Sequence, residues 1–497
     1  MNLRTLLSGL ENYHAIGNLD IEISGLAYDS RKVRPGFIFA ALPGCNVHGL
    51  DFLAEAERAG ASAVLTDRKI STTLPCIYSD SPRLALAFLS DAFYGHPSRH
   101  LRLFAVTGTN GKTTSTFLLR SVLETAGFQC GLLGTVQYRG SHFLSDASLT
   151  TPESLDLQQM LAAMVTEGCG SCVMEVSSHS LIQYRVASSR FEAMIFTNLT
   201  QDHLDYHKTM EDYFQAKWMA FDNQSCTTVT AVINLDDPYG ARILEQRQKL
   251  GLPVISYGFD EKNEYRITDW KSSPAGSELW IEYGAGGDSR DKTLLKTPLI
   301  ARFNAYNVAG VFAALHSSGI SPEVIASGIR QMKQVPGRLE KIHCGQPFLI
   351  LIDYAHTEDA LRQLLQTVRS YTPGKLVLLF GCGGDRDRGK RPRMGEVAGQ
   401  FADMIILTSD NPRSEDPRMI IEDILAGLKT TGNQNVQIIL DRREAIEFAL
   451  KDRHAEDTLL LAGKGHENYQ MIGSEKFHFD EREILAECLA GSYETNS

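Results

Sequence analysis

The most constraining feature of this 497-residue chain is a short glycine loop between a predicted strand and a predicted helix. Residues 103–106 form an apolar run, the loop at 107–114 reads Thr-Gly-Thr-Asn-Gly-Lys-Thr-Thr, and a helix-like stretch covers 115–126. Glycines let backbone N–H groups approach phosphate oxygens, and the start of a helix adds a partial positive charge. This order therefore predicts a loop that wraps nucleotide phosphates. The alternative, a glycine turn with a surface lysine, does not account for the buried strand before it.

Each polar residue of the loop has an expected part in ATP binding. A lysine supplies positive charge for the β- and γ-phosphates, and a following hydroxyl can bind Mg²⁺. The usual loop of this kind has four residues between its glycines, whereas two intervene here and position 106 is Val. The expected ATP-binding residues of the loop are Gly108, Thr109, Asn110, Gly111, Lys112, Thr113 and Thr114, with Thr113 and Thr114 as candidate Mg²⁺ ligands.

The length and net charge of the chain restrict how many domains it can form and which partners it can bind. A chain of this length is expected to form about three domains of ~150 residues each. The net charge is −11, and no block of Lys or Arg indicates a nucleic-acid surface. No stretch approaches the roughly 18 apolar residues of a membrane helix, and the N-terminus lacks the apolar core of a signal peptide. We therefore expect a cytoplasmic protein that binds small-molecule substrates, and neither nucleic acid nor a membrane.

The cysteines are expected to be reduced. Their number, nine, is odd, and they are scattered along the chain. Cys169 and Cys172 form a lone C-x-x-C that runs into an apolar strand and has no second pair. This isolation favours buried or loop thiols over a redox or zinc site.

Strand and helix patterns alternate along the chain and predict an α/β fold with mostly parallel sheets and helices on both faces. We expect three domains: residues 1–98 to form an N-terminal substrate-binding α/β domain, residues 99–336 to form a central P-loop mononucleotide-binding parallel sheet, and residues 337–497 to form a Rossmann-like α/β domain. The predicted strands of the last two domains lie at 103–106, 171–176, 193–197, 229–233, 348–353, 375–380, 403–408 and 458–462.

Polar residues follow two strands of the predicted central sheet. Glu175 ends one strand, and the ends of parallel strands are where ligands bind in such sheets. Mg²⁺ takes oxygen ligands together with phosphates and waters, so Glu175 is a candidate metal ligand, with a helix-capping acid as the alternative. The segment 197–207 holds two aspartates, an asparagine and two histidines, including His203. That density predicts a site, and a second Mg²⁺ fits there.

Three polar clusters follow strands of the predicted third domain. The glycine turn at 380–392 carries several cations, including Arg386, and is expected to bind an anion. An arginine fork, as at Arg413, can grip a carboxylate through two hydrogen bonds. Together with Glu467 as a partner for an ammonium group, these clusters suit a zwitterionic amino acid; the alternative is a set of solvated loops. The full set is Arg386, Asp410, Asn411, Pro412, Arg413, Gly463 and Glu467.

The compressed Gly-x-x-Gly-Lys-Thr-Thr loop resembles that of the Mur ligase family, ATP-dependent enzymes that join an amino acid to a carboxylate, and the resemblance extends over roughly residues 20–490. The segment Asp29-Ser30-Arg31 resembles the uridine-binding segment of that family. The resemblance also implies contacts to a UDP-N-acetylmuramoyl-dipeptide substrate. The residues implied in binding that substrate are Ser30, Thr150, Thr151, Ser177, Gln183 and Arg185.

The same resemblance assigns further residues to ATP and metal. Lys217, an ordinary helix lysine by its spacing alone, lies where the family carries a carbamylated lysine that holds Mg²⁺. Asn304 and Asn307 resemble contacts to the adenine side, and Arg338 and Asp353 resemble ATP contacts from the third domain. The implied catalytic set is Lys112, Lys217 and His203, with His203 or His356 as guesses for the base that deprotonates the amine. The implied metal set is Thr113, Thr114, Glu175, His203 and carbamylated Lys217.

The box Asp410-Asn411-Pro412-Arg413 resembles that of family members that choose meso-diaminopimelate. The resemblance implies ATP-dependent addition of meso-2,6-diaminopimelate to UDP-N-acetylmuramoyl-L-alanyl-D-glutamate through an acyl phosphate, in peptidoglycan synthesis. Addition of L-lysine, addition of D-alanyl-D-alanine and polyglutamylation of folate are alternatives within the family. A P-loop kinase or nucleotide-driven switch, or a non-catalytic UDP-sugar-binding protein, are alternatives from other classes.

Overall fold

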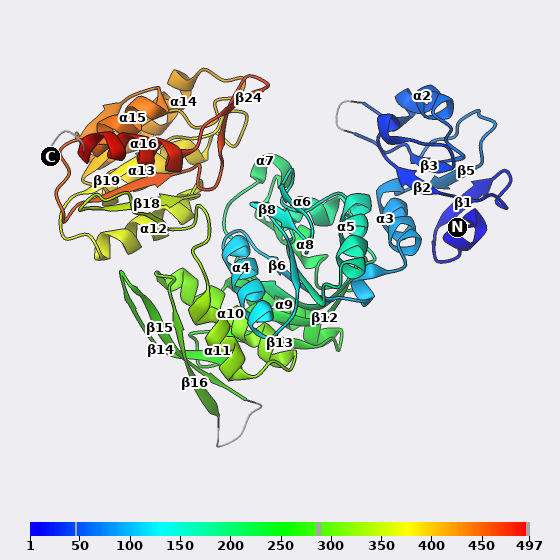
Figure 1. The fold of residues 1–497 in the computed structure, drawn as a ribbon, viewed down its shortest axis with the longest axis horizontal. Helices are drawn as coiled ribbons and strands as arrows, with labels where there is room; N and C mark the ends of the chain where they lie inside the picture. The colour runs from blue at the N-terminus through cyan, green and yellow to red at the C-terminus, as the bar shows by residue number, and fades with distance from the viewer. Residues whose placement is uncertain (45–46, 285–289, 494–497) are drawn as a thin grey trace.

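Three separate sheets organise the chain in the computed structural model, which describes residues 1–44, 47–284 and 290–493. Figure 1 shows an N-terminal unit in blue, a central unit in cyan and green, and a C-terminal unit in yellow to red. The prediction of an α/β fold with mostly parallel sheets is confirmed. The predicted boundaries after residues 98 and 336 stay predictions.

The N-terminal unit has a five-stranded sheet of order β1-β5-β4-β3-β2, parallel except for β1. Apolar residues of the helices and of the strands form its main core. Its elements are α1 (Leu3–Leu7), β1 (Tyr13–Ile16), β2 (Gly25–Ala27), β3 (Phe37–Ala40), α2 (Leu53–Arg58), β4 (Ala63–Thr66), β5 (Cys76–Ser79) and α3 (Pro82–Phe93).

The central unit is built on an eleven-stranded sheet of order β16-β15-β14-β13-β12-β11-β6-β10-β7-β8-β9. Neighbouring strands from β14 to β7 run parallel, and antiparallel strands extend both edges. Helices α4, α10 and α11 cover one face of this sheet, and α5, α8 and α9 cover the other. Each face of the sheet has its own apolar core. The strands are β6 (Arg102–Thr107), β7 (Cys130–Leu133), β8 (Gln137–Arg139), β9 (Leu144–Asp146), β10 (Ser171–Glu175), β11 (Arg190–Phe196), β12 (Thr227–Asn234), β13 (Val254–Gly258), β14 (Tyr265–Ser273), β15 (Gly276–Tyr283) and β16 (Asp291–Thr297), and the helices are α4 (Lys112–Thr125), α5 (Ser154–Thr166), α6 (Ser178–Ile182), α7 (Leu204–His207), α8 (Met210–Trp218), α9 (Pro238–Lys249), α10 (Arg302–Ser317) and α11 (Pro322–Gln331).

The C-terminal unit has a six-stranded sheet of order β17-β18-β22-β19-β20-β21, in which only β17 is antiparallel. Helices α12, α13 and α14 pack on one face and α15 and α16 on the other. Its elements are β17 (Glu340–Ile342), β18 (Leu349–Asp353), α12 (Glu358–Ser370), β19 (Leu376–Phe380), α13 (Lys390–Phe401), β20 (Met404–Leu407), α14 (Pro417–Leu428), β21 (Val436–Ile438), α15 (Arg442–Leu450), β22 (Thr458–Ala462), the hairpin β23 (Tyr469–Ile472) and β24 (Glu475–His478), and α16 (Glu481–Tyr493).

The helix after the glycine loop begins earlier than predicted. Helix α4 starts at Lys112 rather than at residue 115, because Gly111 takes φ +87° and turns the chain directly into the helix. The first N–H groups of a helix have no partner within it. Lys112, Thr113 and Thr114 therefore present such N–H groups at the loop.

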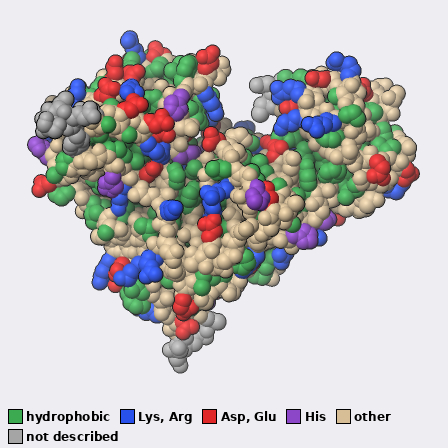
Figure 2. Space-filling view, in the orientation of Figure 1, with side chains coloured by type: hydrophobic (Ala, Val, Ile, Leu, Met, Phe, Trp, Pro, Cys, Tyr) green, Lys and Arg blue, Asp and Glu red, His purple; other side chains and the backbone are tan. Residues whose placement is uncertain are grey.

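No helix within the described residues is both long and apolar enough to cross a bilayer. Figure 2 shows acidic and basic side chains interspersed over the visible face, which is hollowed between the N-terminal and C-terminal units. None of the eight described cysteines forms a disulfide, and Cys169 and Cys172 are buried, which agrees with the expectation of reduced thiols.

Candidate active site

The phosphate loop leaves no room for side chains at its glycines. A Cβ on Gly108 would collide with the hydroxyl of Thr197, and one on Gly111 would collide with the amide of Asn307. Lys112 Nζ folds back over the loop and donates to the carbonyl oxygens of Gly108 (3.0 Å) and Thr109 (2.8 Å). Burial lowers the pKa of Lys112. The loop is thus a tight backbone cradle with one cation held across it.

Glu175 lies beside this cradle at the end of β10. The parallel register pairs Glu175 with Val106 of β6, so the carboxylate emerges next to the loop. It is buried, and its two oxygens accept hydrogen bonds from the backbone N–H of Thr135 (2.9 Å) and the Thr135 hydroxyl (3.0 Å). Strand pairing therefore fixes an oriented carboxylate at the edge where ligands bind in parallel sheets.

Lys217 is buried behind the same cradle. It lies in α8, with Nζ 3.4 Å from the hydroxyl of Thr107 and 4.9 Å from the ring centroid of Tyr213. Burial, followed by the nearby Lys112, lowers the pKa of Lys217 well below its usual range. Burial therefore favours the neutral form of this amine, which is the nucleophilic form.

The histidines near the loop are also held neutral. His203 Nε2 lies 3.4 Å from Asp202 Oδ2, but burial outweighs that carboxylate and lowers the pKa of His203. His356 lies across the cavity, 3.9 Å from the same aspartate, and burial lowers its pKa to about 4. A neutral imidazole can ligate a metal, but a low pKa makes it a weak proton acceptor.

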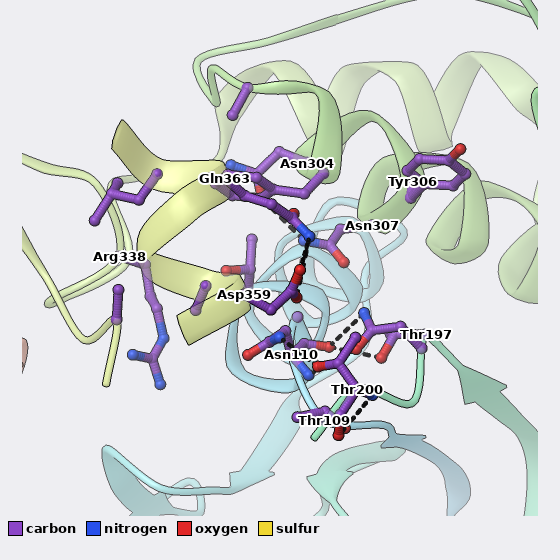
Figure 3. A pocket seen from close by; sticks show the side chains of 18 of the residues that line it. Thr109, Asn110, Thr197, Thr200, Asn304, Tyr306, Asn307, Arg338, Asp359 and Gln363 are labelled. Carbon is purple, nitrogen blue, oxygen red and sulfur yellow. Dashed lines mark hydrogen bonds between the residues drawn. The ribbon is translucent and has the colours of Figure 1, made fainter. Parts of the chain in front are cut away.

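A cavity of about 770 Å³ joins the central and C-terminal units over the loop. Figure 3 shows Arg338 and the α12 side chains Asp359 and Gln363 on one side, with Asn110, Thr197 and Thr200 opposite. Arg338 Nη2 donates to the hydroxyl of Thr113 at 3.2 Å, so the two units touch at the phosphate loop itself.

The remaining residues expected on the ATP side also line this cavity. Asn304 and Asn307 stand on α10, where Asn307 Nδ2 donates to Asn304 Oδ1 at 2.9 Å. Asp353 ends β18, and its carboxylate accepts from the backbone N–H groups of Leu339 (2.7 Å) and Ala355 (2.8 Å). All the residues predicted for ATP except Gly108 therefore line one space.

Five of the six residues implied for the UDP-dipeptide form a second cluster beside Glu175. Arg185 Nη1 donates to the carbonyl oxygen of Thr151 (3.0 Å), and Arg185 Nη2 donates to Gln183 Oε1 (2.6 Å). The hydroxyl of Thr151 accepts from the Ser177 backbone N–H at 3.2 Å. Thr150 joins the cluster through a hydrogen bond between its hydroxyl and that of Thr135 at 3.1 Å, in which the Thr135 oxygen accepts because its proton is donated to Glu175.

The sixth residue of that set, Ser30, lies apart from the cluster. Its hydroxyl belongs to the N-terminal unit and donates to Glu55 Oε2 at 2.8 Å. A ligand that touches both the cluster and Ser30 must therefore extend from the central unit to the N-terminal unit.

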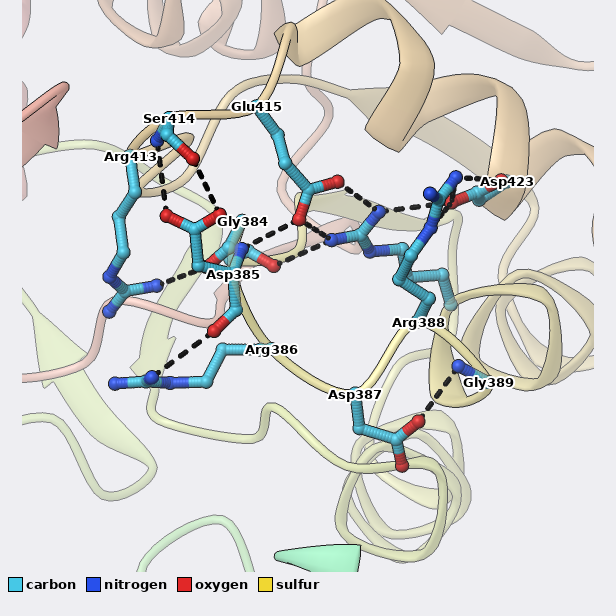
Figure 4. Close-up of polar contacts among 12 residues, drawn as sticks. Gly384, Asp385, Arg386, Asp387, Arg388, Gly389, Arg413, Ser414, Glu415 and Asp423 are labelled. Carbon is cyan, nitrogen blue, oxygen red and sulfur yellow. Dashed lines mark hydrogen bonds and ion pairs between the residues drawn. The ribbon is translucent and has the colours of Figure 1, made fainter. Parts of the chain in front are cut away.

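The residues expected to bind the amino acid gather after β19, β20 and β22. Asn411 Nδ2 donates to Glu467 Oε2 at 2.8 Å, and Arg413 Nη1 donates to the carbonyl oxygen of Gly384 at 2.7 Å. Figure 4 shows the Arg386 and Arg413 side chains on the same side of the two loops. Burial, followed by the Asp410 carboxylate, raises the pKa of Glu467. Two cations and a carboxylate pair thus lie in one pocket.

Tyr354 separates this pocket from the nucleotide cavity. Its ring lies 4.5 Å below the Arg338 guanidinium carbon, and its hydroxyl donates to Glu467 Oε1 at 3.4 Å. The same side chain therefore contacts residues expected to bind ATP and residues expected to bind the amino acid.

Three family models match the chain. They are the Mur ligase family catalytic domain at residues 22–87, the Mur ligase middle domain at 106–315 and the Mur ligase glutamate ligase domain at 337–465.

The chain belongs to the Mur ligase family.

Full-length relatives agree with this membership. UDP-N-acetylmuramoyl-L-alanyl-D-glutamate--2,6-diaminopimelate ligase from Syntrophomonas wolfei is 41% identical, over 99% of this chain and 99% of the relative. A protein of that name from Clostridium acetobutylicum is 40% identical, over 98% and 99%. A solved structure of that name has a TM-score of 0.69 at 32% identity and covers 96% of this chain and 97% of its own.

A more distant Mur ligase shares the fold alone. The D-alanyl-D-alanyl ligase structure from Acinetobacter baumannii has a TM-score of 0.62 at 19% identity, over 100% of this chain and 98% of its own.

Within this Mur ligase, sequence reasoning missed Lys464 and Tyr354. Lys464 lies in one of the three clusters expected to bind the amino acid but was given no role there; it is fully buried, 3.6 Å from both Asp410 and Glu467. A glycine on each side of a lysine, directly after a buried strand, was the available signal. Tyr354 had no such signal, because its two neighbours, Arg338 and Glu467, lie far from each other in sequence.

Proposed function

We propose that this Mur ligase joins meso-2,6-diaminopimelate to UDP-N-acetylmuramoyl-L-alanyl-D-glutamate, at the expense of ATP, as a step of peptidoglycan synthesis. One observation carries the choice of amino acid: the side chains of Arg386 and Arg413 lie on the same side of two neighbouring loops, and Arg413 is close enough to Glu467, which accepts from Asn411, to oppose the rise in its pKa. Diaminopimelate ends in a carboxylate and an ammonium group, whereas lysine lacks that carboxylate. The names of the full-length relatives support the same choice.

In the first step, a carboxylate oxygen of the D-glutamate attacks the γ-phosphorus of ATP. The new O–P bond forms as the bond to ADP breaks, so an acyl phosphate forms and ADP leaves. Negative charge spreads over the transferring phosphoryl group, and fixed cations and N–H groups stabilise it. Lys112 and the N–H groups at the start of α4 are suited to this role, because they already point into the loop.

The donors near the loop fit Mg²⁺, which prefers oxygen ligands. Thr113 and Thr114 offer hydroxyl oxygens, Glu175 offers an oriented carboxylate, and His203 offers a neutral ring. Mg²⁺ bound there would neutralise charge on the phosphate oxygens.

Lys217 fits this metal set only after chemical change, because an amine nitrogen is not an oxygen donor. Its neutral amine can attack CO₂: a nitrogen–carbon bond forms, one carbon–oxygen π bond opens, one proton leaves, and the product is a carbamate whose single negative charge is shared by two oxygens. Its complete burial and lowered pKa support this modification.

In the second step, an amine of diaminopimelate attacks the acyl carbon, phosphate leaves, and the nitrogen loses a proton. Water would compete by hydrolysing the acyl phosphate. The cavity lies between the central and C-terminal units, so we expect these units to close over the substrates during the reaction.

The deciding experiment measures phosphate release from ATP and Mg²⁺ with the UDP-dipeptide, while meso-diaminopimelate, L-lysine or D-alanyl-D-alanine is added in turn. Release that depends on diaminopimelate is the expected result. Release with lysine alone would keep the ligase and overturn the amino-acid assignment. Release that needs no amino acid would favour a kinase or a nucleotide-driven switch.

The variant Arg413→Ala sharpens this test. Loss of a charged hydrogen bond to the substrate carboxylate is expected to cost about 2–4 kcal/mol, or about 30- to 1000-fold in KM for diaminopimelate. The variant should also lose most of its preference for diaminopimelate over lysine. Lysine has no distal carboxylate for Arg413 to bind, so its binding should change little.

A further inference from the structure

The amino-acid pocket contains a buried cation to which the proposed reaction assigns no role. Lys464 follows β22 between Gly463 and Gly465, and its side chain has no exposed surface. Lysine is almost never fully buried unless it is paired, because an ammonium group removed from water needs compensating charge. The partners of Lys464 therefore indicate its purpose.

All three polar partners of Lys464 belong to the set expected to bind the amino acid. Its Nζ lies 3.6 Å from Asp410 Oδ1 and 3.6 Å from Glu467 Oε2, and it donates to Asn411 Oδ1 at 3.2 Å. The rings of Tyr469 and Phe479 lie 5.9 and 5.7 Å from the same nitrogen and cover it on the apolar side. The ammonium group thus sits between two carboxylates and an amide.

Asp410 needs this cation. Its Oδ1 is buried and accepts no hydrogen bond within the described part of the chain, a costly state for a carboxylate oxygen. Lys464 supplies the compensating charge at 3.6 Å. Without it, Asp410 and Glu467 would be two neighbouring carboxylates in a dry pocket, and one of them would take up a proton.

The charges around Glu467 then match those of an ammonium group. Asp410 and Glu467 carry two negative charges and Lys464 one positive charge, which leaves one negative charge for one ammonium group. The Arg386 and Arg413 guanidinium groups lie outside this set of three and remain for the distal carboxylate.

We propose that Lys464 is a positioning residue for amino-acid recognition: it holds Asp410, Asn411 and Glu467 together with one net negative charge, so that Glu467 receives the substrate ammonium as a carboxylate. This inference rests on the proposed function, because it takes the ammonium of diaminopimelate as the ligand of Glu467.

The surroundings of Glu467 give a distinctive pH signature. Burial and Asp410 raise the pKa of Glu467, whereas Lys464, Asn411 and Arg413 oppose the rise. The hydroxyl of Tyr354 donates to its other oxygen, and Tyr469 is the remaining titratable neighbour. Loss of Lys464 removes an opposing charge, so the pKa of Glu467 would rise further, and ammonium binding would then compete with a proton on that carboxylate.

The test compares Lys464→Met with Lys476→Met in the full-length enzyme. Lys476 is an exposed lysine of β24 whose Nζ lies 4.3 Å from the same Tyr469 ring, so it controls for a lysine beside that ring. Phosphate release is measured against diaminopimelate and ATP from about pH 6.5 to about pH 8.5.

Lys464→Met is expected to raise KM for diaminopimelate about 30-fold near pH 7, and that KM should fall by up to about tenfold for each pH unit as Glu467 ionises. We expect kcat and KM for ATP to stay within about threefold of wild type. Lys476→Met should match wild type throughout.

Two results would overturn the inference: a KM profile of Lys464→Met equal to that of Lys476→Met, or a loss of kcat and thermal stability with no pH-dependent change in KM. If Lys464→Met does not fold, Lys464→Met/Asp410→Asn restores one net negative charge. It should fold and show a KM without the steep pH dependence; failure to recover would count against the role of charge balance.

Failure of the proposed function looks different. In that case, wild-type enzyme releases no phosphate in response to diaminopimelate, and the premise of the Lys464 assignment falls with it. An active wild type with an unaffected Lys464→Met keeps the ligase and removes only the positioning role.

Discussion

At the scale of single residues, Lys217 has the environment that most restricts its chemistry. It is buried, lies beside the ring of Tyr213, and has one described polar contact, at 3.4 Å from the Thr107 hydroxyl. A charged amine is poorly stabilised there, and the lowered pKa expresses that fact. A carbamate would convert the position from a cation repelled by Lys112 to an anion attracted by it.

The carbamate leads to a prediction for Lys217→Ala. We expect kcat to fall by at least about 100-fold, because the variant removes charge stabilisation from the phosphoryl-transfer site. Wild-type enzyme given ¹³C-labelled bicarbonate should show a carbamate resonance by NMR, and the variant should lack it. Lys249→Ala, which changes an exposed lysine of α9, is the control and should keep both activity and resonance. A fully active wild type in CO₂-free buffer without that resonance would contradict the carbamate.

At the scale of elements, the loop after β19 and the loop after β20 are braced against each other. Asp385 and Arg413 both adopt left-handed backbone conformations, at φ +53° and +51°, which cost free energy for residues other than glycine. The Asp385 carboxylate accepts from the backbone N–H and the hydroxyl of Ser414, and Figure 4 shows this bridge. Beneath it, the buried Arg391 holds Glu415 and Asp423.

The brace predicts different effects for two arginines that contact the same aspartate. Arg391 is buried, whereas 61% of the Arg388 side chain is exposed, and both lie within about 3 Å of Asp423 Oδ2. Arg391→Met leaves Glu415 without its ion-pair partner and Asp423 with the exposed Arg388, and should destabilise the C-terminal unit by about 3–5 kcal/mol, or roughly 6–15 °C in Tm. Arg388→Met should change Tm by about 1–2 °C at most. Equal shifts in a calorimetric scan would contradict the brace.

The ion pair between Arg391 and Glu415 predicts that the folded protein loses stability in acid. The Arg391 hydrogen bonds hold the pKa of Glu415 at about 2, below its ordinary value of 4.5. A lowered pKa stabilises the folded state above the unfolded value, and the contribution is lost as pH falls through the folded value. The Tm of wild type should therefore decline between about pH 4.5 and about pH 2, and Glu415→Gln should show less of that decline. Glu422→Gln, an exposed change on α14, should follow wild type.

Strands were the most predictable elements, and the edges of the central sheet the least. The predicted strand at 458–462 coincides with β22, and that at 171–176 differs from β10 by one residue, because buried parallel strands are short apolar runs between turns. The antiparallel strands β14, β15 and β16 were not predicted. The alternating burial along β14 was the available signal, but a strand exposed on one face has a weaker apolar pattern.

At the scale of the whole molecule, the central and C-terminal units meet around the nucleotide cavity through polar and apolar contacts. Arg338 reaches Thr113, and Arg393 of α13 donates to Gln201 Oε1 at 2.6 Å. Ile300 and Ala301 of the central unit pack in the apolar core of the C-terminal unit. We expect the two units to move apart when substrates enter or products leave, and the exposed polar contacts to contribute little each to holding them together.

Arg393→Ala tests this weak attachment. Loss of the Gln201 contact should shift the population toward separated units and raise KM for ATP by about two- to fivefold, with kcat nearly unchanged, because a surface hydrogen bond contributes about 0.5–1 kcal/mol. Small-angle scattering should show a larger mean radius for the variant without nucleotide. Arg443→Ala, on the far helix α15, is the control. An unchanged radius and KM would show that the contact does not hold the units together.

The site was predictable where one segment carries the signal and not where distant segments meet. The loop at 107–114 and the end of β10 are local patterns, and the structure brings both to the nucleotide cavity. Lys217 depended on family resemblance, because burial of an ordinary helix lysine follows from packing. Lys464 depends on Asp410, more than fifty positions away, so only the folded chain discloses its pairing.

The side chain of Tyr354 lies between the nucleotide cavity and the amino-acid-binding residues and contacts both. Its ring supports Arg338, which contacts the phosphate loop, and its hydroxyl contacts Glu467. A ligand that moves Tyr354 in one compartment changes the binding affinity of the other compartment for its ligand. By thermodynamic linkage, the two ligands change each other's affinity by the same factor. An inhibitor selected against the nucleotide compartment alone would therefore be chosen against a surface that changes once the amino acid is bound, so screening belongs with both compartments occupied.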